Sequence, residues 1–152
     1  MKVTFVCVGN TCRSPLLKGL FSRYAKTQGV ECEVESAGLY VTDGKISPET
    51  EKMLLDCGIS VENQNPTTLN KTLVDSSDLI VAVSTDVAEM IMKLGCENKV
   101  YSLSSPLLLG EDMLDPYHKG EEAYKQVFDQ AVRALPKVMS LLQMVKQRRE
   151  TL

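Results

Sequence analysis

A cysteine and an arginine near the start of the chain have the spacing of a phosphate-binding loop. Cys7 lies near the end of an apolar run, residues 3–8, and Arg13 follows after five residues, directly before Ser14 and Pro15. The run favours a β-strand, and proline favours the first turn of a helix. Backbone N–H groups in such a loop bind an anion, and arginine offers two parallel donors to phosphate oxygens. The same positive field stabilises a thiolate, so we interpret Cys7 as a nucleophile toward a phosphorylated group.

The residues inside this loop fit a tight path around an anion. Gly9 is expected to supply a positive φ angle. The side-chain amide of Asn10 is expected to hold the loop, with Ser36 at the end of the next strand as its partner, and the Ser14 hydroxyl is expected to assist the thiolate. A buried, inert cysteine is the alternative for Cys7 alone, but the loop that follows makes it the weaker one. A dinucleotide-binding loop is also a weak alternative, because its fingerprint has three glycines and this loop has one.

The reaction also needs a proton donor for the leaving group and a base for the attacking water. Asp115, in the sequence Asp115-Pro116-Tyr117, is the candidate, because proline stiffens the turn that presents it. An Asp-Pro pair alone is an ordinary turn signal, and the cysteine–arginine loop is what gives it weight. Tyr117, and Tyr40 after the second strand, are expected to flank the mouth of the pocket.

Composition limits the class of protein. With 152 residues, 43% of them hydrophobic, the chain is expected to form one domain, residues 1–152, around a single core. The net charge of −3 provides no broad basic field for nucleic acid. We find no apolar run near the roughly 20 residues that span a bilayer, and no signal peptide. The five cysteines are not spaced as a disulfide framework or as zinc ligands, which favours a reducing, cytoplasmic compartment.

Strand and helix patterns alternate along the chain, which favours an α/β fold with a parallel sheet. A helix is expected to begin at Pro15, a second at Pro48 after the capping residue Ser47, and a fourth at the capping residue Thr85. The remaining expected elements are strands at residues 3–8, 32–36, 79–83 and 99–103, a short helix at 69–74 and a long final helix at 121–146.

Other reactive side chains are given structural roles. His118 is the only histidine, and we expect a solvated loop residue, because one histidine cannot build a metal site. Cys32, Cys57 and Cys96 lie in apolar or helix-end contexts and are expected to be structural thiols. We therefore expect no metal and no cofactor.

Three motifs together resemble the low-molecular-weight protein tyrosine phosphatase family: VCVGNTCRSP at residues 6–15, Ser36-Ala37-Gly38 and Asp115-Pro116-Tyr117. Their order and the chain length match over the whole sequence. The resemblance implies a three-layer, Rossmann-like α/β fold of the phosphotyrosine protein phosphatase I type, with a central four-stranded parallel sheet flanked by helices. It implies cysteinyl-phosphate chemistry without a metal. The implied roles are Cys7 as nucleophile, Arg13 as phosphate binder and Asp115 as general acid and base, with Val8, Gly9, Asn10, Thr11, Cys12, Ser14 and Ser36 forming or supporting the phosphate loop.

Three loop positions bear on regulation and specificity. Cys12 matches the family's second cysteine, which can form a protective disulfide with the nucleophile. Gln64 stands where many members carry a histidine that supports the phosphate loop. Thr11 stands where the tyrosine phosphatases usually carry a bulkier aliphatic residue, and bacterial relatives with threonine there act on phosphoarginine in proteins. A hydroxyl can accept a hydrogen bond from a guanidinium, whereas an aliphatic wall suits a phenyl ring.

Phosphotyrosine hydrolysis is therefore the first hypothesis, and phosphoarginine hydrolysis is its close competitor. Arsenate reduction is more remote, because it needs a relay of further cysteines and only Cys96 stands near the fourth helix. A non-catalytic phosphoprotein-binding module is disfavoured, because the nucleophile and the acid are both present. The expected partner is a phosphorylated protein, with no nucleic acid and no membrane, and the expected state is a monomer or weak dimer.

Overall fold

The computed structural model describes residues 1–62 and 64–151 and contains one four-stranded sheet. The strands are β1 (Lys2–Cys7), β2 (Glu33–Gly38), β3 (Leu79–Ala82) and β4 (Val100–Ser102), all parallel and in the order β2-β1-β3-β4. From β1 the chain first adds β2 on one side, and then adds β3 and β4 on the other side. The carboxyl end of β1 is thus the point where the strand order reverses, which is where open α/β sheets bind ligands.

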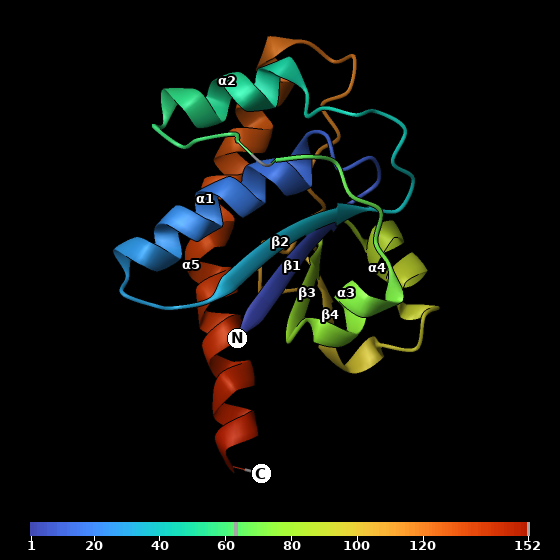
Figure 1. The fold of residues 1–152 in the computed structure, drawn as a ribbon, viewed down its shortest axis with the longest axis vertical. Coiled ribbons are helices and arrows are strands. Elements are labelled where there is room, and N and C mark those ends of the chain that lie inside the picture. Colours follow the sequence, from blue (N-terminus) through green and yellow to red (C-terminus); the bar gives the residue numbers. More distant parts are fainter. Residues whose placement is uncertain (63, 152) are drawn as a thin grey trace.

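Helices cover both faces of this sheet (Figure 1). Helices α1 (Arg13–Thr27) and α5 (Glu121–Thr151) pack against each other, and α4 (Thr85–Met92) packs on β3 and β4. Since parallel crossovers are right-handed, α1 and α4 leave the sheet on opposite faces. Two shorter helices, α2 (Pro48–Asp56) and α3 (Lys71–Ser76), and the 3-10 turn η1 (Glu97–Lys99) complete the described part of the chain. The predicted α/β fold with a parallel four-stranded sheet is confirmed.

Burial explains why the two central strands, β1 and β3, are largely apolar. All four residues of β3, LIVA, are fully buried, as are the last five residues of β1, as expected for strands covered on both faces. Phe5 of β1 meets Phe21 of α1 edge-on, with ring centroids 5.7 Å apart. The apolar stripe of α5 adds Val127, Ala131 and Val138 to the same core. No helix in residues 1–62 and 64–151 is long and apolar enough to cross a bilayer.

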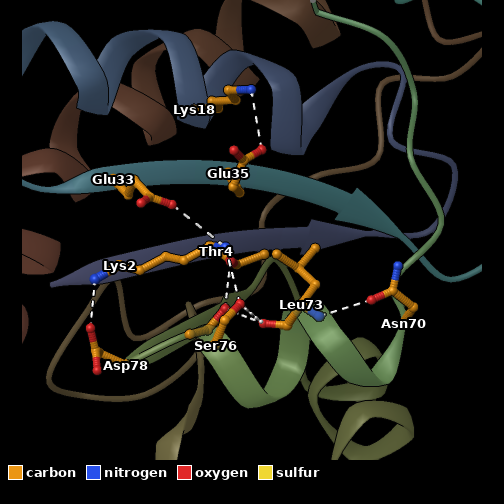
Figure 2. A network of polar contacts seen from close by, with 10 residues as sticks. Lys2, Thr4, Lys18, Glu33, Glu35, Asn70, Leu73, Ser76 and Asp78 are labelled. Carbon is orange, nitrogen blue, oxygen red and sulfur yellow. Dashed lines mark hydrogen bonds and ion pairs between the residues drawn. The ribbon is translucent and has the colours of Figure 1, made fainter.

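A polar network fixes the amino end of β1, far from the carboxyl end that carries Cys7 (Figure 2). The Lys2 backbone N–H donates to Asp78 Oδ2 at 2.6 Å, and its Nζ donates to Ser76 Oγ at 3.0 Å. Thr4 Oγ1 and Ser77 Oγ share a hydrogen bond of 2.7 Å. These contacts tie β1 to the segment that leads into β3. They hold the register in which Val3 lies opposite Leu79 of β3.

Three of the predicted helix starts are wrong, each for a local reason. Helix α3 begins at Lys71 rather than at residue 69, because Asn70 is extended and its Oδ1 accepts the Leu73 N–H at 2.8 Å. Helix α1 begins at Arg13 rather than Pro15, so the arginine belongs to the first helical turn. The cap of α4 is Ser84 rather than Thr85, because Ser84 is extended and its Oγ accepts the Val87 N–H at 3.3 Å. Thr85 is already helical, and its N–H donates to Asp112 Oδ1 at 2.9 Å. The predicted Ser47 cap and the Pro48 start of α2 are confirmed.

Candidate active site

The cysteine thiol lies at the carboxyl end of β1, in front of the amino end of α1. Cys7 is 2% exposed, and its Sγ accepts the Asn10 backbone N–H at 3.2 Å and contacts Ser14 Oγ at 2.9 Å. Cys12, the N-cap residue of α1, makes no side-chain cap bond within the described chain. The first N–H groups of this 15-residue helix are therefore available to an anion beside the thiol. The Asn10 N–H and the amino end of α1 place partial positive charge beside Sγ, at the place where a phosphate would bind.

Asn10, and not Gly9, supplies the left-handed turn of the loop, which corrects the sequence-based expectation. The φ angle of Asn10 is 55°, while Gly9 is not among the residues with positive φ. A Cβ on Gly9 would meet only Thr11 Oγ1, at 3.8 Å. Asparagine tolerates this conformation better than other side chains do, and here its buried amide is held in place.

The amide of Asn10 is the structural centre of the phosphate loop. Its Nδ2 donates to Ser14 Oγ at 2.7 Å and to Ser36 Oγ at 3.0 Å, so the contact expected with Ser36 is present. Its Oδ1 accepts the Thr67 backbone N–H at 2.8 Å. All of its side-chain hydrogen-bonding atoms therefore have partners, from three different segments. Together with the Asn10 N–H bond to Cys7, these contacts set the position of the loop relative to the thiol.

Gln64 stands in place of the family's histidine, and the chain near it supports the phosphate loop through Thr67 instead. Gln64 lies beside Lys18 and Arg23 in a separate surface pocket, and its N–H donates to Val61 O at 3.1 Å. The loop that follows α2 reaches Asn10 through the backbone of Thr67. Every residue except proline has a backbone N–H, so the sequence does not indicate that the N–H of Thr67 is the one that bonds Asn10.

Gly38, at the end of β2, allows the phosphate loop to approach the sheet. A Cβ at this position would lie 2.8 Å from Val8 O and 2.9 Å from Asn10 N. Both are backbone atoms of the loop and cannot swing aside as a side chain could. In the Ser36-Ala37-Gly38 motif, Ser36 is thus a hydrogen-bond partner of the phosphate loop, and Gly38 has no side chain that would collide with that loop.

The phosphate loop meets the loop that carries Asp115, residues 113–117 (the acid loop), at Arg13. This side chain is buried, its Nη1 donates to Met113 O at 3.3 Å, and its Nη2 lies 3.9 Å from Asp115 Oδ2. Asp115 Oδ1 accepts the Tyr117 N–H at 3.2 Å, which fixes the turn around the proline. The three residues assigned to catalysis therefore come together across more than a hundred positions of sequence.

Gln130 of α5 positions the acid loop and was not predicted. It is 7% exposed, accepts the Leu114 N–H at 3.0 Å and donates to Asp112 O at 3.2 Å. These bonds hold the backbone on either side of Met113, the residue that accepts from Arg13. The helical pattern of α5 predicts that this position faces inward, but it carries no sign of what Gln130 contacts.

A cleft of about 300 Å³ opens above the thiol. Tyr40 and Tyr117 line it, and each is 65% exposed. Thr11 and Asp43 also line it, and Asp43 had no role in the sequence-based interpretation. The remaining lining residues are Cys7, Val8, Gly9, Cys12, Arg13, Thr42 and Asp115.

The other cysteines and the histidine lie outside the chemistry described so far. Burial raises the pKa of the Cys32 and Cys96 thiols, in keeping with structural roles. His118 is exposed and packs against Tyr117 with ring centroids 4.0 Å apart and the rings tilted by 58°. Cys12 is a free thiol whose Sγ lies 3.6 Å from Tyr124 Oη. In the described residues no group of three or more His, Cys, Asp or Glu side chains could hold a metal ion.

Comparison with known proteins agrees with this geometry. The family model for low molecular weight phosphotyrosine protein phosphatases matches residues 2–150. The chain belongs to this family. The resemblance of its three motifs is thereby confirmed, and the protein is a phosphatase of the hydrolase class. Its relatives, however, are named for two different phosphorylated residues.

Two curated relatives illustrate this division. The phosphatase is 33% identical over 134 residues to the protein-arginine-phosphatase of Bacillus subtilis, with 86% of this chain and 89% of that protein covered. It is 32% identical over 143 residues to the low molecular weight protein-tyrosine-phosphatase PtpB of Staphylococcus haemolyticus, covering 91% and 97%. Overall similarity therefore does not separate the two substrates.

Solved structures agree on the fold. A mutant of YwlE from Bacillus subtilis superposes with a TM-score of 0.86 at 29% identity, covering 94% of this chain and 99% of that one. A Cys-to-Ser mutant of the YwlE arginine phosphatase, with a phosphorylated active-site serine, gives the same TM-score and identity over 94% and 96% of the two chains. The low-molecular-weight phosphatase of T. tengcongensis has a TM-score of 0.85 at 28% identity, covering 92% and 98%.

Proposed function

We propose that this phosphatase removes phosphate from phosphorylated side chains of proteins through a cysteinyl-phosphate intermediate on Cys7, and that phosphoarginine is its preferred group. The observation that carries the chemistry is the placement of the Cys7 thiol, 2.9 Å from Ser14 Oγ and in front of the amino end of α1. The buried guanidinium of Arg13 lies next to it in the same cleft, and Asp115 faces that guanidinium.

In the first step, the Cys7 thiolate attacks phosphorus in line with the bond to the substrate. The S–P bond forms, and the P–N bond of phosphoarginine or the P–O bond of phosphotyrosine breaks. Protonated Asp115 gives its proton to the departing nitrogen or oxygen. Arg13 and the loop N–H groups hold the equatorial phosphate oxygens, where the charge of the transition state resides.

In the second step, water attacks the phosphorus of the cysteinyl phosphate. The Asp115 carboxylate takes a proton from that water, the S–P bond breaks, and the electron pair returns to Cys7 as a thiolate. The Ser14 hydroxyl, 2.9 Å from Sγ, donates to the departing thiolate. Inorganic phosphate is released, and Asp115 is again protonated for the next turnover.

Two residues of the cleft favour phosphoarginine. Thr11 presents a hydroxyl that can accept from a guanidinium N–H, and Asp43 adds a carboxylate to the same lining. A phenyl ring offers no hydrogen-bond donor to either side chain, so the half-buried Thr11 hydroxyl would lose water without a replacement bond. Phosphotyrosine remains the second candidate, because Tyr40 and Tyr117 at the mouth of the cleft present aromatic surface to a phenyl ring.

The test is a side-by-side comparison of kcat/KM on two peptides that differ only in carrying phosphoarginine or phosphotyrosine. Wild-type protein should favour phosphoarginine, and Thr11→Ile should shift the ratio toward phosphotyrosine by roughly tenfold, since an aliphatic wall without the hydroxyl no longer accepts from the guanidinium. Thr72→Ile, the same change at an exposed position of α3, is the matched control. A wild-type preference for phosphotyrosine that Thr11→Ile leaves unchanged would contradict the assignment.

A further inference from the structure

A groove of about 730 Å³ opens directly beside the catalytic cleft. It runs between the loop that leads into α2 and the start of α5, which lie next to each other in Figure 1. Thr11, Cys12, Asp43 and Tyr117 line both the groove and the cleft. The two spaces therefore form one continuous depression, with the Cys7 thiol in its smaller part.

The walls of this groove are bonded to the phosphate loop. The Ser47 N–H donates to Thr11 O at 2.8 Å, and Thr50 Oγ1 donates to Cys12 O at 3.3 Å. On the other side, Cys12 Sγ lies 3.6 Å from Tyr124 Oη of α5. The groove thus has a set position relative to the thiol, as a binding site for the rest of a substrate would require.

The charged residues that line this groove are mainly acidic. Four exposed carboxylate side chains face it, namely Asp43, Glu49, Glu51 and Glu121, against one lysine, Lys45. In the part of the chain that the structure describes, none of these four carboxylates has an ion pair with lysine or arginine. Acidic residues in a first helical turn also stabilise the helix, which explains part of the pattern on α2 and α5. Asp43 lies in a loop and stabilises no helix.

We propose that this acidic groove binds the polypeptide next to the phosphorylated residue, and that preferred substrates carry lysine or arginine there. This inference rests on the proposed function, because the groove gains its role from the cleft it continues. A phosphorylated side chain that reaches Cys7 leaves its main chain at the cleft mouth. From there Asp43 and Tyr117 lead into the groove, where basic side chains meet unpaired carboxylates.

The test uses three phosphopeptides of equal length with lysine, glutamine or glutamate at the positions flanking the same phosphorylated residue. In wild-type protein, kcat/KM should be roughly three- to tenfold higher for the lysine peptide than for the glutamine peptide, and lowest for the glutamate peptide. The preference should reside mainly in KM and shrink at high salt, because exposed charges are screened.

A pair of variants with the same change in net charge locates the effect. The double substitution Glu51→Gln and Glu121→Gln should reduce the lysine-to-glutamate ratio of kcat/KM, a ratio that a general loss of activity would not move. The control double substitution, Glu89→Gln and Glu97→Gln, changes exposed residues outside the groove and should keep the wild-type ratio.

The outcomes separate this inference from the proposed function. Equal kcat/KM for all three peptides, or an equal loss of preference in both double variants, would overturn the acidic-groove proposal and leave the phosphatase assignment intact. Absence of turnover on every phosphopeptide and on a small aryl phosphate would instead overturn the proposed function.

Discussion

Adding one methyl group at Gly38 should damage the phosphate loop without touching any side chain assigned to catalysis. In Gly38→Ala the new Cβ would lie 2.8 Å from Val8 O, 2.9 Å from Asn10 N and 3.0 Å from Asn10 Cβ. Ordinary contacts are about 3.4 Å or longer, so the loop or the end of β2 must move by about 0.5 Å or more. Overpacking of this kind costs about 1–3 kcal/mol, offset in part by about 0.4–1 kcal/mol because alanine restricts the unfolded chain.

The displaced groups are the Asn10 N–H that bonds Cys7 Sγ and the backbone next to it. Since misplacing reacting groups by about 1 Å can reduce a rate 10²-fold, kcat on an aryl phosphate should fall by roughly ten- to a hundredfold. Urea unfolding should show a loss of about 1–2 kcal/mol. In Gly44→Ala the new Cβ meets no atom within 4 Å, so its unfolding free energy should stay within about 0.5 kcal/mol of wild type. A Gly38→Ala protein with wild-type stability and a kcat within about twofold of wild type would refute this reasoning.

Three further substitutions test other parts of the site. Asn10→Gly and Asn10→Ala both remove the side-chain amide, but only alanine is disfavoured at a φ angle of 55°. Urea unfolding should therefore show that the alanine variant is about 1 kcal/mol less stable than the glycine variant. Equal stabilities of the two variants would count against a strained turn at this position. Gln130→Ala removes two hydrogen bonds that hold the acid loop, so Asp115 should protonate the leaving group less well. The decrease in kcat should be largest for substrates with poor leaving groups. An equal decrease for all leaving groups would argue that Gln130 does not position Asp115. Burial raises the pKa of Cys96, so above about pH 8.5 the unfolded chain loses the thiol proton while the native state keeps it. The free energy of unfolding should therefore decline as the pH rises above that value, and Cys96→Ala should make this decline less steep. An unchanged slope in the variant would contradict the prediction.

Much of this site could be predicted because its chemistry lies in a continuous stretch. A strand, a short loop and a helix start place Cys7 and Arg13 together whatever the rest of the chain does. The parallel sheet followed from apolar runs such as β3, whose residues are buried on both faces. Asp115 could be predicted because the cysteine–arginine loop requires an acid and an Asp-Pro turn offers one.

The errors have physical causes. Glycine is the default candidate for a left-handed turn, but the three partners of the Asn10 side chain hold asparagine in that conformation instead. Ser84 and Thr85 are both good capping residues, and only the backbone decides which one is extended.

The omissions share another cause. Thr67 acts through its backbone, and Gln130 lies on a helical face whose pattern indicates burial but not partners. The acidic groove joins residues from three separate segments, so its charge is visible only in the folded chain.

The central claim is that phosphate passes through Cys7, and rapid-quench trapping followed by peptide mapping tests it most directly. The trapping uses Asp115→Asn with an aryl phosphate whose leaving group needs no protonation, so that the first step proceeds while the second lacks its base. The mechanism predicts phosphate on the peptide that contains Cys7, formed within the first turnover and released slowly. Phosphate on another residue, or steady turnover by Cys7→Ser at the wild-type rate, would contradict it.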